Sequence, residues 1–283
     1  MCSTLVYDED LIRNFYIKVI ANTPRADFDT DFFCVVARSK YLSGDYRHAI
    51  QLGDALLEKV VLKTVDEERF LNRIHRADSC VDWATSFNGK SIPKNCMVMY
   101  MNVNHTSSVK AIRNLKNDIE TLENELVDCL LGSGMTNNIG NKLKNLDTLV
   151  LKAMQNPKCI SKKNWIDIDM DIPNDMYTID YVMNVLNNLG ISEDGRVIIM
   201  SRGGYHILIR TSFISEYNSK YVDTVLKGEK VDKTMILSID KIVDAFSSDI
   251  ADRGYEAKEI KINQNMMVPI PGTIQGNHKV EMY

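Results

Sequence analysis

The sequence predicts a protein of the α+β or mixed α/β class, built on a mixed β-sheet with a helical insertion. Short runs of β-branched and aromatic residues alternate along the chain with longer segments of helical periodicity. Two expected strands, 197–200 and 205–210, are separated only by a tight turn, and such a hairpin step excludes a purely parallel sheet. Apolar and acidic residues alternate with period two over 164–173, which is typical of a strand with one polar face.

The composition is that of an ordinary globular protein. The chain has 283 residues, 45% of them hydrophobic, which suffices for one large domain or two small ones. The formal net charge is −4, so any contact with nucleic acid has to come from a local basic patch. The six cysteines are scattered without a C-x-x-C pair, which argues against a zinc site. No apolar run of membrane-spanning length and no signal peptide is visible, so we expect a cytoplasmic protein without a membrane partner.

The spacing of apolar residues predicts the other elements. Helices are expected at 46–62, 66–76, 138–155, 178–189 and 236–250, after a short helix and a turn within 1–30. Strands are expected at 32–37, 96–103 and 258–262, and a glycine-punctuated loop at 270–280. A long amphipathic helix begins near Ser107 or Ser108. Its apolar stripe is more typical of a core face than of a docking face, and consists of Ile112, Leu115, Ile119, Leu122, Leu126 and Leu130.

The acidic strand is the first candidate site. It reads Asn-Trp-Ile-Asp-Ile-Asp-Met-Asp-Ile-Pro over 164–173. Side chains two apart leave the same face of a strand, so Asp167 and Asp169 lie side by side. Neighbouring carboxylates repel unless a cation lies between them, and Mg²⁺ commonly binds one or two carboxylates together with substrate phosphates. The alternative is an edge strand with a solvated acidic face.

The turn between the two hairpin strands is the second candidate site. It reads Ser-Arg-Gly-Gly-Tyr-His over 201–206. Paired glycines allow close backbone approach, and the hydroxyl of Ser201, the guanidinium of Arg202 and the imidazole of His206 are all groups that bind phosphate oxygens. The alternative is a plain hairpin with a core histidine.

Basic residues in two other places are candidate phosphate ligands. The stretch 267–280, Met-Val-Pro-Ile-Pro-Gly-Thr-Ile-Gln-Gly-Asn-His-Lys-Val, ends on His278 and Lys279 after a structured turn. Arg38 and Lys40 directly follow the expected strand 32–37. Solvated side chains are the alternative in both places.

The stretches 164–173, 201–206 and 267–280, in this order, resemble the archaeo-eukaryotic primase superfamily. This superfamily includes primase small subunits, primase-polymerases and many phage and plasmid replication primases. The family pattern is D-x-D or D-x-E on a strand, a serine-to-histidine turn, and a third acid before a Pro-Gly-containing loop. Ile166-Asp-Ile-Asp169, Ser201–His206 and Pro271-Gly-Thr-Ile-Gln-Gly276 match it. The resemblance covers 160–283 and is weaker over 31–155. It implies an N-terminal α/β part (1–105), a helical insertion before the D-x-D strand (106–160) and a mixed-sheet catalytic core (161–283).

The chain departs from the family pattern near its end. The third acid is expected at Glu259, with Glu256 as the alternative and Asn263 or Glu281 less favoured. The family's His-Gly-Lys is Gln-Gly-Asn at 275–277, and the arginines that usually precede this loop are absent. The phosphate-binding role of that motif would then pass to His278 and Lys279.

The resemblance implies a DNA primase or primase-polymerase. Such an enzyme catalyses template-directed nucleotidyl transfer from NTPs or dNTPs on single-stranded DNA. Catalysis would use two Mg²⁺ or Mn²⁺ ions. The implied metal ligands are Asp167, Asp169 and Glu259 or Glu256, and the implied nucleotide ligands are Ser201, Arg202, His206, His278 and Lys279. His206 is also expected to act in catalysis. No G-x-x-x-x-G-K-[ST] motif is present, so a separate replicative helicase is the expected partner. A phage-encoded enzyme would work in the host cytoplasm.

Three other functions are compatible with the same residues. A non-catalytic replication-initiation or nucleic-acid-binding protein would keep the fold, and the altered final motif favours it. A metal-dependent nuclease would explain the acids without requiring the turn 201–206 to bind a triphosphate. A structural protein with an acidic edge strand would not respond to metal ions.

Overall fold

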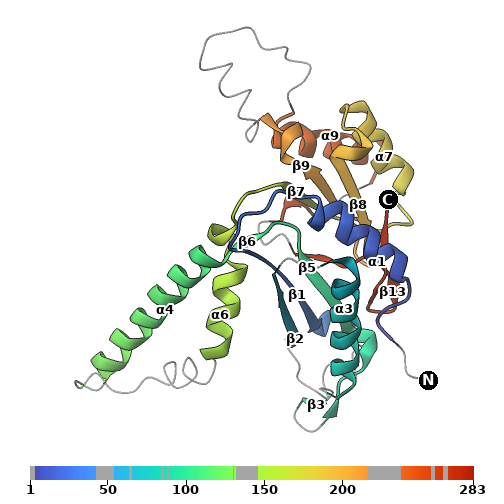
Figure 1. Cartoon of the computed structure of the whole chain (residues 1–283). Coiled ribbons are helices and arrows are strands. Elements are labelled where there is room, and N and C mark those ends of the chain that lie inside the picture. The colour runs from blue at the N-terminus through green and yellow to red at the C-terminus, as the bar shows by residue number, and fades with distance from the viewer. Residues whose placement is uncertain are drawn as a thin grey trace, which may run out of the picture.

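The computed structural model describes residues 4–42, 54–63, 66–83, 86–87, 90–129, 131, 146–215, 237–255, 259–263 and 267–283. Within this part of the chain the fold is mixed α+β, as predicted, and contains two five-stranded sheets (Figure 1). The predicted mixed sheet is wrong, because all strand pairings described in these two sheets are antiparallel. None of the helices in these ranges is both long enough and apolar enough to cross a membrane.

The first sheet has the strand order β11–β5–β1–β2. Its strands are β1 (Asp29–Ala37), β2 (Ala55–Leu62), β5 (Met97–Asn102) and β11 (Met267–Pro269), with β6 (Thr106–Ser107) paired to one end of β1. Alternate residues of β1 pack in one core with α1 (Glu9–Phe15), η1 (Tyr16–Ala21) and α3 (Glu67–Trp83). The opposite face of β1 carries Cys34 and Val36 and lines a cleft.

The second sheet has the strand order β10–β7–β9–β8–β14. Its elements are β7 (Trp165–Asp171), α7 (Ile179–Asn188), β8 (Arg196–Met200), β9 (Tyr205–Arg210), α9 (Ile239–Asp252), β10 (Glu259–Ile262) and β14 (Glu281–Met282). The first six follow one another as β-α-β-β-α-β with two split β-α-β units, which is the ferredoxin-like arrangement. The predicted hairpin 197–210 is confirmed as β8 and β9.

The two faces of β7 have different surroundings. Ile166, Ile168 and Met170 are fully buried in a core that also contains residues of α7 and α9. On the other face, Trp165 joins the core of the first sheet, together with Leu208 of β9. The acidic residues of β7 share this second face, because alternate residues of a strand point the same way. The two sheets are therefore joined by shared apolar packing at one end and leave polar side chains at the other.

The helices α4 (Ser108–Asp128) and α6 (Leu146–Gln155) pack against each other and project together from the rest of the molecule (Figure 1). Ser107 caps α4, accepting a hydrogen bond from the backbone nitrogen of Lys110, where the sequence predicts the start. The predicted single core stripe is wrong in part. Leu122 is buried, but Ile112 and Ile119 are 65% and 48% exposed.

Two further predictions differ from the structure. The helix predicted over 46–62 is wrong for 55–62, which forms β2. The apolar residues of the run Ala-Leu-Leu-Glu-Lys-Val-Val-Leu are compatible with both a helix and a strand. Its pairing with β1 decides for the strand. The loop predicted at 270–280 contains a short hairpin, β12 (Ile274–Gln275) and β13 (His278–Lys279). The predicted helix 138–155 is confirmed over 146–155, while 46–53 and 138–145 lie outside the described residues.

The fold also contains several short helices and strands. They are η2 (Ser39–Tyr41), β3 (Ser86–Phe87), β4 (Lys90–Ser91), η3 (Lys94–Cys96), η5 (Pro157–Cys159), η6 (Glu193–Gly195) and η7 (Thr211–Phe213). The helices predicted at 66–76, 178–189 and 236–250 are confirmed as α3, α7 and α9. The strands predicted at 32–37, 96–103 and 258–262 are confirmed as β1, β5 and β10.

Candidate active site between the two sheets

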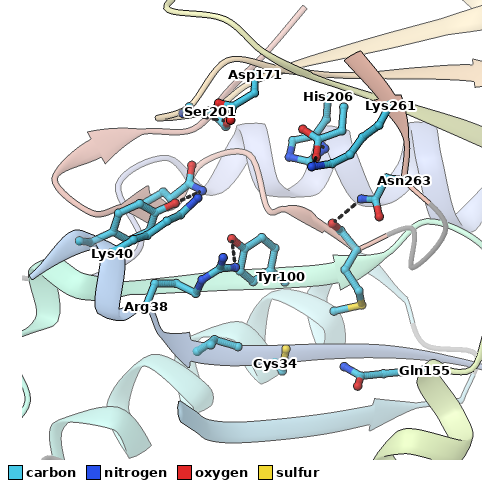
Figure 2. Close-up of a pocket in the computed structure, with 16 residues that line it drawn as sticks. Cys34, Arg38, Lys40, Tyr100, Gln155, Asp171, Ser201, His206, Lys261 and Asn263 are labelled. Carbon is cyan, nitrogen blue, oxygen red and sulfur yellow. Dashed lines mark hydrogen bonds and ion pairs between the residues drawn. The ribbon is translucent and has the colours of Figure 1, made fainter. Parts of the chain in front are cut away.

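A cleft of about 420 Å³ lies between the polar face of the second sheet and the free face of the first. One side is formed by β7, β9, β10 and the turn after β8, and we call it the acidic wall; it contributes Asp169, Asp171, Ser201 and His206. The other side is formed by the end of β1, η2 and β5, and we call it the basic wall; it contributes Arg38, Lys40, Tyr41 and Tyr100. Figure 2 shows Asp171, Ser201 and His206 on one side of the cavity, and Arg38, Lys40 and Tyr100 on the other.

Asp167 lies behind the surface of the acidic wall. Its side chain is fully buried, and its carboxylate contacts Nδ1 of His206 at 3.2 Å. The side-chain amide of Asn263 donates to the same carboxylate oxygen at 2.7 Å. Asp167 therefore holds two neighbours in place, and does not itself line the cleft.

Asp169 and Asp171 present their carboxylates to the cleft. Asp169 lies 3.9 Å from Nδ1 of His206 and 3.7 Å from the ammonium of Lys261, which stands directly across from it on β10. Asp171 is exposed at the end of β7. The period-two pattern predicts that alternate acids of this strand share one face, and Asp171, the third acid, lies on the same face.

His206 is nearly buried and surrounded by negative charge. Burial by itself lowers the pKa of the imidazole, but the carboxylates of Asp167 and Asp169 outweigh it. The net result is a raised pKa, despite an opposing contribution from Lys261. A protonated His206 donates through Nδ1 to Asp167, and its other ring nitrogen, Nε2, then remains as a second donor.

The turn 201–204 brings the backbone of the acidic wall close to β7. The backbone nitrogen of Ser201 donates to the carbonyl of Gly204 at 2.8 Å, and Asn174 donates to the carbonyl of Ser201 at 2.9 Å. Gly204 has a φ of +147°, and a Cβ there would lie 2.1 Å from the carbonyl oxygen of Met170. A glycine is therefore required at this position. The predicted turn is confirmed, and Ser201 lies in the cleft.

Arg202 is held away from the cleft. Its guanidinium stacks over the ring of Tyr41, with 4.6 Å between its central carbon and the ring centroid. It also donates to the carbonyl of Gly276 at 3.0 Å, and its backbone nitrogen donates to the side chain of Gln275. Arg202 therefore ties the serine turn to the loop before β13.

The basic wall is a connected network. Arg38 donates to the hydroxyl of Tyr100 at 3.1 Å and forms an ion pair with Asp54. The amide of Gln275 donates to the hydroxyl of Tyr41 at 2.8 Å. Burial raises the pKa values of both tyrosines, so their hydroxyls stay protonated. The wall thus offers fixed hydroxyl and guanidinium groups to a ligand.

Lys40 is the second cation of the basic wall. Partial burial lowers its pKa, and the charge of Arg38 acts in the same direction. Asp171 and Asp169, across the cleft, oppose this change without cancelling it. Lys40 is therefore electrostatically coupled to both walls.

Two of the remaining predicted site residues lie away from the cleft. His278 and Lys279 are exposed on β13, where the ammonium of Lys279 stands 4.9 Å from the ring centroid of Tyr7, and neither lines the cleft. Glu259 is paired with Asp171 across β10 and β7, which places it beside the acidic wall, although its side chain is not among those described. Glu256 lies outside the described residues.

The donor set of the acidic wall suits a hard cation in its chemistry. Carboxylate oxygens are the ligands that Mg²⁺ and Mn²⁺ prefer, and a carboxylate that accepts two hydrogen bonds, like that of Asp167, keeps further lone pairs. Among the side chains that the structure describes, no group of three or more His, Cys, Asp and Glu residues is arranged to hold a metal ion. A three-acid site would therefore need a side chain outside this set, such as Glu259 or its alternative Glu256.

Comparison with known proteins gives no relative for this chain: no family model, no curated protein and no solved structure matches it.

Several cleft residues were not predicted as site residues, among them Asp171, Tyr41, Tyr100 and Lys261, while Asn263, a less favoured candidate for the third acid position, also lines the cleft. Asp171 continues the acidic alternation, and this pattern is a signal that could have identified it. Lys261 and Asn263 follow Glu259 at two-residue steps, Lys261 within β10 and Asn263 directly after it, so this spacing places them on the same face as Glu259. Tyr100 carries no comparable signal, since it sits in an apolar run.

Proposed function

We propose that this protein is a template-directed nucleotidyltransferase of the primase or primase-polymerase type, which joins NTPs or dNTPs on single-stranded DNA. The observation that carries the proposal is the opposition of Asp169 and Asp171 to Arg38 and Lys40 across one cleft. A nucleoside triphosphate with its divalent cations presents both signs of charge, so a cleft with one acidic and one basic wall complements it. The order of the sequence motifs supports the same proposal.

Asp167, Asp169 and Glu259 would hold the metal ions, and Asp171 is a further candidate ligand because it lines the cleft. When bound, two such ions would lower the pKa of the attacking hydroxyl and neutralise charge on the transferred phosphate. The ammonium of Lys261 beside Asp169 would have to move away or share the carboxylate.

In the reaction, the 3′-hydroxyl oxygen forms a bond to the α-phosphorus, the bond from this phosphorus to the pyrophosphate oxygen breaks, and the hydroxyl proton passes to solvent. The protein contributes mainly position and charge. His206, held through Nδ1 by Asp167, donates from Nε2 to a phosphate oxygen and offsets charge on the leaving pyrophosphate. Arg38 and Lys40 bind the triphosphate from the opposite wall, with Ser201 as a hydroxyl donor.

The test is incorporation of labelled nucleotides on single-stranded DNA with Mg²⁺ or Mn²⁺, with and without a primer. We expect products that disappear in the Asp167→Asn and Asp169→Asn variants, while circular dichroism shows an unchanged fold. Products without a primer would identify a primase, and products only with a primer would identify a polymerase. Retained synthesis in both variants would contradict the metal-ligand assignment.

One observation favours a second candidate, a non-catalytic nucleic-acid-binding protein with the same fold. The ion pair between Lys261 and Asp169 places a cation where a catalytic metal would bind. This candidate predicts nucleotide or DNA binding without metal dependence, and no incorporation. Release of labelled nucleotides from a DNA strand in the absence of added triphosphates would instead indicate a metal-dependent nuclease.

A further inference from the structure

Helix α4 has an apolar stripe that is exposed beside its contact with α6. Its inner side packs in a small core through Ala111, Leu115 and α6 residues. The outer stripe is exposed, and its apolar members are Val109, Ile112, Ile119 and Val127, followed by Leu131 just beyond the helix. Figure 1 shows α4 extending away from both sheets with α6 on one side only. Exposure of this many large apolar residues along one projecting helix is typical of an interaction surface.

The stripe includes two charged residues, Lys116 and Glu123, at the helical spacing of the apolar ones. Two pairs of its residues are related about one point of the helix, an apolar pair of like residues and a charged pair of opposite sign. Ile112 and Val127 lie equally far from the point midway between Ile119 and Glu120, and so do Lys116 and Glu123. Such a pattern is self-complementary for a helix that packs antiparallel against its own copy.

The charges of α4 are also segregated along its length. The first half carries Lys110, Arg113 and Lys116, and the second half carries Asp118, Glu120, Glu123, Glu125 and Asp128. The helix macrodipole favours the opposite distribution, with acids near the N-terminus and bases near the C-terminus. The observed distribution therefore does not serve the isolated helix. An antiparallel copy aligns each basic half with an acidic half.

We propose that α4 forms a homodimer interface in which a second copy of this chain packs antiparallel along the outer stripe. The two-fold axis passes near Ile119, so Ile112 faces Val127 of the partner subunit. Lys116 then faces Glu123 of the partner subunit, and the same pair recurs across the axis. The choice of a second copy over another partner rests on this charge complementarity.

The interface fixes the shape of the dimer. Helix α4 has 21 residues and rises about 1.5 Å per residue, so the helix pair is about 30 Å long. Because α4 leaves the body at its N-terminus and the two helices are antiparallel, the two cleft-bearing bodies lie at opposite ends. This arrangement goes beyond the proposed function and does not depend on it, since the test below measures association alone.

The test is sedimentation velocity of the full chain over a wide range of concentrations. The wild type is expected to dimerise as concentration rises. Lys116→Glu places glutamate opposite Glu123, and Glu123→Lys places lysine opposite Lys116, so each variant alone is expected to weaken the dimer at least about tenfold. An equimolar mixture of the two variants is expected to restore dimerisation, because opposite charges face each other again in the mixed dimer.

The control is Lys241→Glu on α9, an exposed reversal of the same charge outside α4, which leaves the dimer unchanged. Ile112→Ser with Ile119→Ser removes the apolar contact and is expected to give a monomer of unchanged helical content. A wild type that stays monomeric, single variants that dimerise like the wild type, or a mixture that stays monomeric would each overturn the proposal.

Discussion

The two walls of the cleft are built in different ways. The carboxylates of the acidic wall come from one strand, β7, at positions two residues apart, and His206 comes from the neighbouring strand β9 directly opposite Asp169. The basic wall collects Arg38 and Lys40 from the end of β1 and from η2, Tyr100 from β5 and Gln275 from β12. Local strand geometry positions the first wall, whereas long-range packing assembles the second.

The residues of the two walls also differ in how firmly their neighbours hold them. On the acidic wall, Asp167 is buried and bound to both His206 and Asn263, so loss of one group leaves a charged neighbour without its partner. On the basic wall, Arg38 and Lys40 remain partly open to solvent. We therefore expect substitutions on the acidic wall to have larger effects than those on the basic wall.

The largest effect is expected for Asp169→Asn. Removing one preorganised charge that faces the reacting phosphate should lower kcat/KM for nucleotide incorporation by roughly 10²–10³-fold. Asp180→Asn, an exposed acid on α7, serves as the matched control and should be close to wild type. Similar losses in both variants would mean that general destabilisation, and not the cleft, accounts for the effect.

The next largest effect is on the free energy of unfolding, and it should differ between two adjacent glycines of the acidic wall. Gly204→Ala should destabilise the protein by about 3 kcal/mol, because its φ is positive and the new Cβ meets backbone atoms. Gly203→Ala should cost less than about 1 kcal/mol, because its Cβ would lie 3.3 Å from a side-chain oxygen of Asp171 that can shift. Denaturant unfolding followed by circular dichroism measures both. Equal costs would contradict the described turn.

The smallest effect is expected on the basic wall. Lys40→Gln should raise KM for the nucleotide about tenfold with little change in kcat, as expected for one charged hydrogen bond to a phosphate. Lys279→Gln is the matched control, because Lys279 lies outside the cleft, and its KM should stay unchanged. Steady-state kinetics at fixed metal concentration compares them. The reverse result would return the phosphate-binding role to the final motif.

The sequence identified the parts of the cleft that depend on local order. The alternation over 164–173 predicted that Asp167 and Asp169 share a face, and the glycine pair predicted the turn before His206. Arg202, His278 and Lys279 were also expected to contact a nucleotide, but none of them lines the cleft. Arg202 is held by Tyr41 and Gly276, and Lys279 lies over the ring of Tyr7, and all of these partners are distant in sequence from the side chain they contact.

The sequence by itself determined the fold class, most of the helices and strands, and the acidic face of β7, because these follow from periodicities of two and 3.6 residues along the chain. Only the tertiary structure decided that 55–62 is a strand, that Asp167 is buried behind Asp169, and that Arg38 and Lys40 face the acids. Each of these depends on contacts between residues distant in sequence, and no local pattern encodes such contacts.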